Sequence, residues 1–205
     1  MVKEIRIYIE GGGDKKETKK AIRLGFSEFL KDLRQIAQKN RIRWKIIVCG
    51  SRQNAFGDFK NALKANPNAF NILLVDAEAP VNTTPCQHLK LRDNWDLDNI
   101  DDEHCHLMVQ TMEAWLIADI EALKKFYGSG FKEKALSNNN PEVEKIDKKQ
   151  LEPSLKAATR HTQKGEYHKI QHASKLLALL EVDKVRQVAP HCDRLFITLI
   201  QKMSI

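Results

Sequence analysis

The chain has 205 residues, of which 42% are hydrophobic and 30% are charged. This length predicts one compact domain, or one domain with a small appendage. No stretch approaches the roughly 18 consecutive apolar residues of a membrane-spanning helix, so no membrane association is expected. The four cysteines are scattered and form no CxxC pair. This argues against a zinc knuckle or a disulfide scaffold and predicts a reduced, cytoplasmic setting.

The net charge of +7 is distributed unevenly along the chain. Residues 1–70 carry 16 basic and 7 acidic side chains, and residues 71–103 carry 2 and 8. Residues 104–205 carry 16 basic and 12 acidic side chains. An acidic middle therefore lies between two basic flanks, which favours a polyanionic partner such as nucleic acid.

The first half of the chain alternates strand-like and helix-like patterns. Strands are predicted at 5–9, 44–49 and 70–75, and amphipathic helices over 16–39 and 52–64. This βαβαβ order predicts an α/β fold with a parallel sheet and right-handed crossovers. Ligands of such sheets bind beyond the carboxyl ends of the strands.

The second half is less regular. Residues 79–103 predict a long loop, and residues 129–166 are polar and lysine-rich, with a break at 138–141. A short strand is predicted at 104–109, and helices at 112–119, 119–127, 169–180 and 192–202. We expect a core over residues 1–127 and a helical C-terminal extension, residues 128–205, packed on it.

Acidic residues follow the first and third predicted strands. Glu10 precedes Gly11-Gly12-Gly13 and Asp14, and Asp76 and Glu78 follow the third strand. Carboxylates gathered on one sheet edge repel one another and require a cation when they are partly desolvated. Oxygen ligands without His or Cys indicate Mg²⁺ or Mn²⁺.

Simpler interpretations exist for each acidic pair taken alone. Glu10 and Asp14 can cap the first helix, and polar residues routinely follow strands. The glycine run lacks the GxGxxG spacing of a dinucleotide site and the Gly-Lys of a P-loop. Because both acidic pairs fall on one predicted edge, we favour the functional interpretation.

These features resemble the Toprim fold, the metal-binding catalytic domain of topoisomerases, primases and OLD-type nucleases. The segments HLMVQTMEAWLIAD (106–119) and KGEYHKIQHASKLL (164–177) are similar to a bacterial Toprim-like family, domain of unknown function 4276. Its members often lie beside ATPase genes in restriction or phage-defence loci. The resemblance implies a nucleic-acid substrate and a partner ATPase.

The resemblance also assigns roles to individual residues. Glu10 matches the Toprim glutamate, Asp14 the second acid of OLD-like nucleases, and Asp76 the first Asp of the DxD motif. Glu78 stands where the second Asp is expected, and its longer side chain changes where a metal would lie. Lys169 corresponds to a late lysine of OLD-like nucleases.

The implied chemistry is phosphodiester hydrolysis with two Mg²⁺ or Mn²⁺ ions. Lys169 would neutralise charge on the phosphate, and Glu10 would act as general base if only one ion binds. The alternative is a non-catalytic Toprim-like module that binds nucleic acid or the ATPase. Nucleotidyl transfer of the primase kind is a third, less favoured interpretation.

Two further groups are candidates for the site. Glu113 lies in an otherwise apolar predicted helix and needs either a partner or a metal, unless it is on an exposed face. Lys15, Lys16, Lys19 and Lys20 directly follow the acidic loop. They form either a track for the phosphates of a nucleic acid or the solvated face of a helix.

Overall fold

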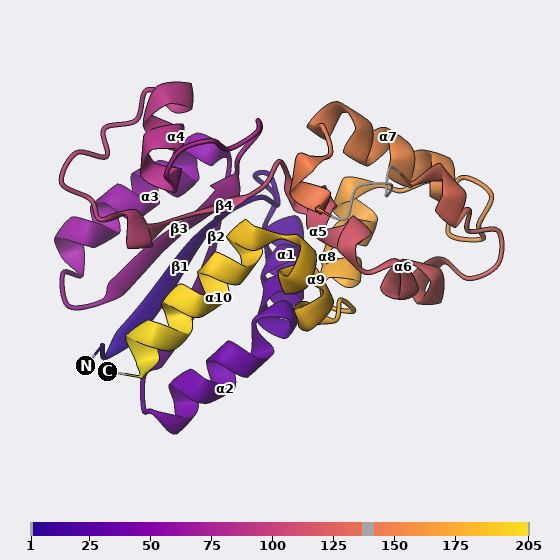
Figure 1. Ribbon diagram of the computed structural model, residues 1–205. Coiled ribbons are helices and arrows are strands. Elements are labelled where there is room, and N and C mark those ends of the chain that lie inside the picture. Colours follow the sequence, from indigo (N-terminus) through magenta and orange to yellow (C-terminus); the bar gives the residue numbers. More distant parts are fainter. Residues whose placement is uncertain (1, 137–141, 205) are drawn as a thin grey trace.

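A four-stranded parallel sheet, with strand order β2-β1-β3-β4, forms the centre of the molecule (Figure 1). The computed structural model describes residues 2–136 and 142–204. The strands are β1 (Glu4–Glu10), β2 (Arg43–Gly50), β3 (Phe70–Asp76) and β4 (Cys105–Met108). The predicted α/β fold with its parallel βαβαβ core is confirmed, and the architecture is consistent with a Toprim-like fold.

Helices cover both faces of this sheet (Figure 1). One face packs against α1 (Lys16–Phe29), α2 (Lys31–Lys39) and α10 (Pro190–Met203), and the other against α3 (Arg52–Ala65) and α4 (Pro85–Asp93). Strand β1 divides its side chains accordingly, because Ile7 joins the first core and Tyr8 the second. Strand β3 is buried along its whole length, as its continuous apolar sequence predicts.

The remaining helices form a group beside the sheet (Figure 1). They are α5 (Met112–Ala118), α6 (Ile120–Tyr127), α7 (Lys148–Thr159), α8 (Lys169–Leu177) and α9 (Val182–Val188). Helix α8 packs closely on α1, where a Cβ atom at Gly25 would lie 2.6 Å from the carbonyl oxygen of Ser174. This close approach holds α8 against α1. None of the helices in the described part of the chain is long and apolar enough to cross a membrane.

Several elements differ from the sequence prediction. The helix predicted over 16–39 is divided at Leu30, whose backbone leaves helical geometry, into α1 and α2. The region predicted as a loop contains α4, which begins after a Thr84 hydroxyl cap with Pro85 in its first turn. Asn94 adopts the left-handed conformation and ends that helix.

The C-terminal half also holds more helix than its sequence pattern indicates. Helices α7 and α9 are unpredicted, and the helix expected over 169–180 ends at Leu177. Asp119 caps α6 as predicted, accepting a hydrogen bond from the Ala122 N–H. The break predicted at 138–141 lies outside the described residues.

Candidate functional site

A tight glycine loop follows Glu10 at the end of β1. Strand pairing shifts by one residue here, so that Glu10 lies opposite Gly50 and the Gly11 N–H donates to the Gly50 carbonyl at 2.8 Å. The backbone φ of Gly50 is +93°, and a Cβ atom there would lie 2.6 Å from the Gly13 carbonyl oxygen. Only glycine fits this position, so the loop can fold back against the end of β2.

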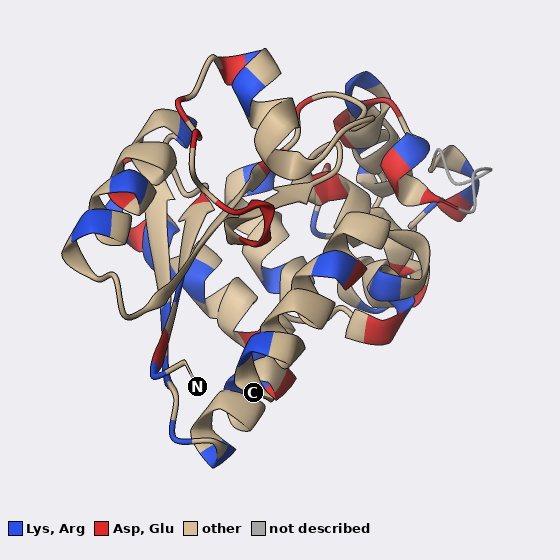
Figure 2. Ribbon diagram, turned by 60° about the vertical axis from the view of Figure 1, so that its left-hand side comes forward, with Lys and Arg blue, Asp and Glu red and all other residues tan. Residues whose placement is uncertain are grey.

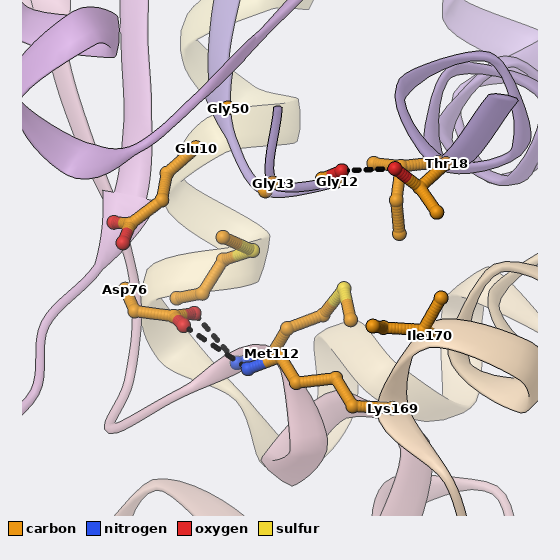
Figure 3. Close-up of a pocket in the computed structure, with 12 residues that line it drawn as sticks. Glu10, Gly12, Gly13, Thr18, Gly50, Asp76, Met112, Lys169 and Ile170 are labelled. Carbon is orange, nitrogen blue, oxygen red and sulfur yellow. Dashed lines mark hydrogen bonds and ion pairs between the residues drawn. The ribbon is translucent and has the colours of Figure 1, made fainter. Parts of the chain in front are cut away.

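The loop forms one side of a pocket of about 220 Å³ at the carboxyl ends of β1 and β3 (Figure 3). The pocket is lined by Glu10, Gly11, Gly12, Gly13, Thr18, Ile22, Gly50, Asp76, Met108, Met112, Lys169 and Ile170. The structure therefore brings together Glu10, Asp76 and Lys169, which are 66 and 93 residues apart in sequence, at the sheet edge where α/β proteins bind ligands.

Asp76 is buried at the end of β3. Its Oδ1 atom accepts a hydrogen bond of 2.8 Å from the Met112 N–H, and its Oδ2 atom lies 3.7 Å from Lys169 Nζ (Figure 3). Burial raises the pKa of Asp76 to about 7 in spite of Lys169, and the neighbouring carboxylates of Glu113 and Glu10 add to the rise. The negative charge on Asp76 is therefore incompletely compensated by the protein itself.

Lys169 begins α8 and lies between two carboxylates. Its Nζ atom is 3.2 Å from Glu113 Oε1, which also accepts a hydrogen bond of 3.1 Å from the Tyr167 hydroxyl. Burial favours the neutral amine, but Asp76 and Glu113 outweigh it and raise the pKa of Lys169 above its ordinary value. Lys169 is thus a fixed positive charge, and Glu113, which is 2% exposed, has the partners that its apolar helix requires.

Glu10 has a different partner, which the sequence analysis does not single out. Arg52, the first residue of α3, donates from Nη1 to Glu10 Oε2 at 3.0 Å. Burial raises the pKa of Glu10, and Arg52 opposes that rise. The sequence holds one signal for Arg52: it follows the second strand after a Gly-Ser turn, and so starts a helix at the same sheet edge.

Glu78 and Asp14, the two other predicted acidic ligands, lie outside the pocket lining, as Glu113 does. Glu78 is in the left-handed conformation with φ of 63°, and its carboxylate accepts from Lys148 Nζ and lies 3.9 Å from Arg92. Burial alone would raise the pKa of Glu78, but Lys148 and Arg92 lower it. Asp14 is exposed and lines a separate surface depression. The three left-handed glycines carry the chain away from Glu10 before Asp14 is reached.

The four predicted phosphate-binding lysines differ among themselves. Lys15, Lys16 and Lys20 are exposed near the start of α1. Lys19 is partly buried and donates to the Cys49 carbonyl at 3.0 Å, which holds α1 against the end of β2. Figure 2 shows basic residues spread over many of the helices, with acidic residues among them, so the positive charge is not gathered into a single basic half of the molecule.

The carboxylates of the pocket fit a hydrated divalent cation. Mg²⁺ is usually held by one or two carboxylates together with water and substrate phosphates, and Glu10 and Asp76 supply such a pair. Within residues 2–136 and 142–204, no group of three His, Cys, Asp or Glu side chains converges into a cage for a metal ion. The donor set therefore suits an ion that keeps water or phosphate ligands, and does not suit a fully protein-coordinated ion.

The fold and this pocket define an α/β protein with two acidic side chains and a lysine gathered in a pocket at the carboxyl edge of a parallel sheet. The family model for the domain of unknown function DUF4276 matches residues 9–200, so the chain belongs to this family. The match includes every residue that lines the pocket. No curated protein and no solved structure gives a significant match.

Proposed function

We propose that the protein hydrolyses phosphodiester bonds of nucleic acid with the help of Mg²⁺ or Mn²⁺ held by Glu10 and Asp76. The observation that carries this proposal is the meeting of two incompletely neutralised carboxylates and one fixed lysine in a single pocket. The resemblance to Toprim nucleases supports the same chemistry. The expectation of two ions rests on that resemblance alone.

Each charged residue of the pocket has a task in this reaction. A water oxygen bonds to phosphorus, the bond to the leaving oxygen breaks, and a proton from the water passes to that oxygen, which yields a phosphate monoester and a hydroxyl. A bound divalent cation supplies Lewis acidity and lowers the pKa of water. Lys169, held by Asp76 and Glu113, places a positive charge beside the phosphate oxygens on which negative charge develops.

The region around the pocket offers contacts to the rest of a nucleic acid strand. Lys15, Lys16 and Lys20 follow the glycine loop and remain exposed, so their ammonium groups are free to contact flanking phosphates. A partner ATPase, a role in phage defence and a cytoplasmic location are proposed from the family resemblance. The protein would then act as the nuclease component of such a module.

Cleavage of labelled DNA and RNA in the presence of Mn²⁺, Mg²⁺ or EDTA tests the proposal. We expect metal-dependent cleavage that falls at least 100-fold in Glu10→Gln and Asp76→Asn, because each change removes a carboxylate ligand. Glu4→Gln, at the other end of β1, is the matched control and should retain cleavage. Absence of cleavage with every metal, with or without the ATPase, would refute the function. Unchanged cleavage in both pocket variants would refute the site.

A non-catalytic module that binds nucleic acid or an ATPase is the second candidate. The observation that favours it is the pairing of Glu78 with Lys148, which leaves the position of the second DxD acid outside the pocket lining. The same samples distinguish the two functions. Retarded migration of nucleic acid on a gel, with no product under any metal condition, would support binding without cleavage.

A further inference from the structure

The guanidinium of Arg52 is anchored on the side away from the pocket. Its Nε atom donates to Asp93 Oδ1 at 3.0 Å, and its Nη2 atom donates to Asp93 Oδ2 at 2.7 Å. This two-pronged geometry orients a guanidinium more strictly than a single hydrogen bond does. Both side chains are largely buried, with 16% and 11% of their surface exposed.

Trp95 restrains the same guanidinium from a second direction. The carbon at the centre of the Arg52 guanidinium lies 5.1 Å from the centre of the Trp95 ring, within cation–π distance. Trp95 in turn stacks on Phe56 with ring centres 4.3 Å apart, and its indole N–H donates to Gln53 at 3.3 Å. The anchor therefore includes residues of α3 and the turn after α4, and Arg52 has little freedom to swing.

The remaining nitrogen, Nη1, connects the ends of two strands. It donates to Glu10 Oε2 at 3.0 Å and also to the backbone carbonyl of Asp76. One atom thereby ties the Glu10 carboxylate, at the end of β1, to the end of β3. Nη1 engages only Oε2 of the Glu10 carboxylate, which the Asp76 backbone also hydrogen-bonds.

The charge of Arg52 is already matched by Asp93. A guanidinium without a matching anion beside Glu10 would repel a divalent cation. The two-pronged pair with Asp93 adds no net charge to the site, and Arg92, which also contacts Asp93, has a second acidic neighbour in Glu78. The effect of the pair on the pocket is therefore chiefly geometric.

We propose that Arg52 is a positioning residue that sets the place of the Glu10 carboxylate relative to Asp76. Asp93 and Trp95 hold the guanidinium still, and the guanidinium holds Glu10. The two pocket carboxylates are then presented at a fixed separation to one divalent cation. This inference rests on the proposed function, since it assigns Arg52 to the cation site of that function.

Replacing the whole pair tests the geometric role apart from the charge. Arg52→Met combined with Asp93→Asn removes one positive and one negative charge, so the net charge is unchanged. We expect Mn²⁺ binding, measured by calorimetry, to weaken at least tenfold, as is usual when a partner of a metal ligand is removed. The matched control is Arg194→Met with Asp102→Asn. These residues also form a guanidinium–carboxylate pair, at 2.9 Å, but beside Cys105 at the amino end of β4. Mn²⁺ binding by this control variant should stay within twofold of wild type.

The single variant Arg52→Lys keeps the charge but cannot form the two-pronged contact. We expect at least threefold weaker Mn²⁺ binding, which also tests the inference if the double variant does not fold in a urea titration. Mn²⁺ binding within twofold of wild type in a folded double variant, or in Arg52→Lys, would overturn the role of Arg52 alone. Wild-type protein that binds no Mn²⁺ would overturn this inference and the cation site of the proposed function together.

Discussion

The two ends of β1 each carry a glutamate, and the two side chains have opposite electrostatic surroundings. Glu4, at the amino end, pairs with Arg6, Arg43 and Lys45 at 2.9 to 3.0 Å. Hydrogen bonding to Lys45 and the other pairs lower its pKa. Glu10, at the carboxyl end, pairs with Arg52, and burial raises its pKa.

This difference separates an acid that serves the fold from an acid that is available to a ligand. The charge of Glu4 is met by three cations, so a further cation gains little there. Glu10 shares Arg52 with Asp93, and the nearby Asp76 is held with a pKa of about 7. The acids at the carboxyl edge of the sheet are therefore only partly compensated by Arg52 and Lys169, and groups with such perturbed pKa values gather at functional sites.

The largest expected effect concerns the cost of keeping Asp76 ionised. Its pKa is about 7 in the folded protein and 3.8 ordinarily, so the folded state retains the proton more strongly. Stability of the wild type should then fall as the pH rises from about 4 to about 7, and stay low above that range. Asp76→Asn keeps the acceptor for Met112 and removes this cost, which amounts to about 4 kcal/mol at 1.36 kcal/mol per pH unit.

Urea unfolding of both proteins at pH 4 and pH 8 measures the difference. We expect Asp76→Asn to be the more stable protein at pH 8, with the advantage disappearing at pH 4. An Asp76→Asn variant less stable than wild type at pH 8 would show that the buried acid is compensated, and the contrast with Glu4 would disappear.

The next effect concerns the fixed positive charge at the carboxyl edge. Lys169→Met removes the ammonium that lies against Asp76 and Glu113. Cleavage should fall by about 100-fold, equivalent to about 2.7 kcal/mol of transition-state stabilisation. Lys175→Met, an exposed position on the same helix, serves as control and should keep its rate. Equal rates for the two variants would remove Lys169 from the site.

The glycine loop that follows the carboxyl end of β1 and packs against Gly50 allows a third test. Gly50→Ala places a Cβ atom 2.6 Å from the Gly13 carbonyl oxygen at a φ of +93°, and should lower the free energy of unfolding by about 2 kcal/mol or more. Gly13→Ala, with φ of +56° and no atom within 4 Å, should cost about 1 kcal/mol. Thermal or urea unfolding ranks the two variants. The reverse order would mean that the loop is not packed against β2.

The smallest expected effect concerns Glu4, at the amino end of β1. Glu4→Gln should lower stability by about 1 kcal/mol near pH 7, because its partners Arg43 and Lys45 are exposed and screened. Since the pKa of Glu4 is lowered from 4.5, its contribution is present above that pH and is lost as the pH falls below it. The difference between wild type and Glu4→Gln in urea unfolding should therefore shrink as the pH falls below 4.5. A difference that persists there would show that packing, and not charge, is what the substitution removes.

The positions of Glu10 and Asp76 can be predicted from the sequence, because the residues that end adjacent parallel strands lie at the same edge of the sheet. Apolar strand patterns end at Glu10 and at Asp76, and the carboxyl ends of adjacent parallel strands share an edge. Lys169 is not predictable in this way. Its position depends on the packing of α8 on α1 at Gly25, a contact between segments that are distant in sequence.

The spacing of residues in the sequence does not predict where Asp14 and Glu78 lie, because each follows a turn. Backbone conformation decides where Asp14 and Glu78 point, and left-handed residues carry both away from the pocket lining. Arg52 and Asp93 are missed for a related reason, because α4 lies in a stretch whose composition resembles a loop. Only the folded structure shows that Asp93, at the end of α4, contacts Arg52, at the start of α3.

Calorimetric titration of Mn²⁺ into the wild type, Glu10→Gln and Glu4→Gln at pH 8 tests the contrast between the two ends of β1 most directly. We expect wild type and Glu4→Gln to bind Mn²⁺ equally, and Glu10→Gln to bind at least tenfold more weakly. Equal binding by all three proteins, or no binding by the wild type, would contradict this expectation.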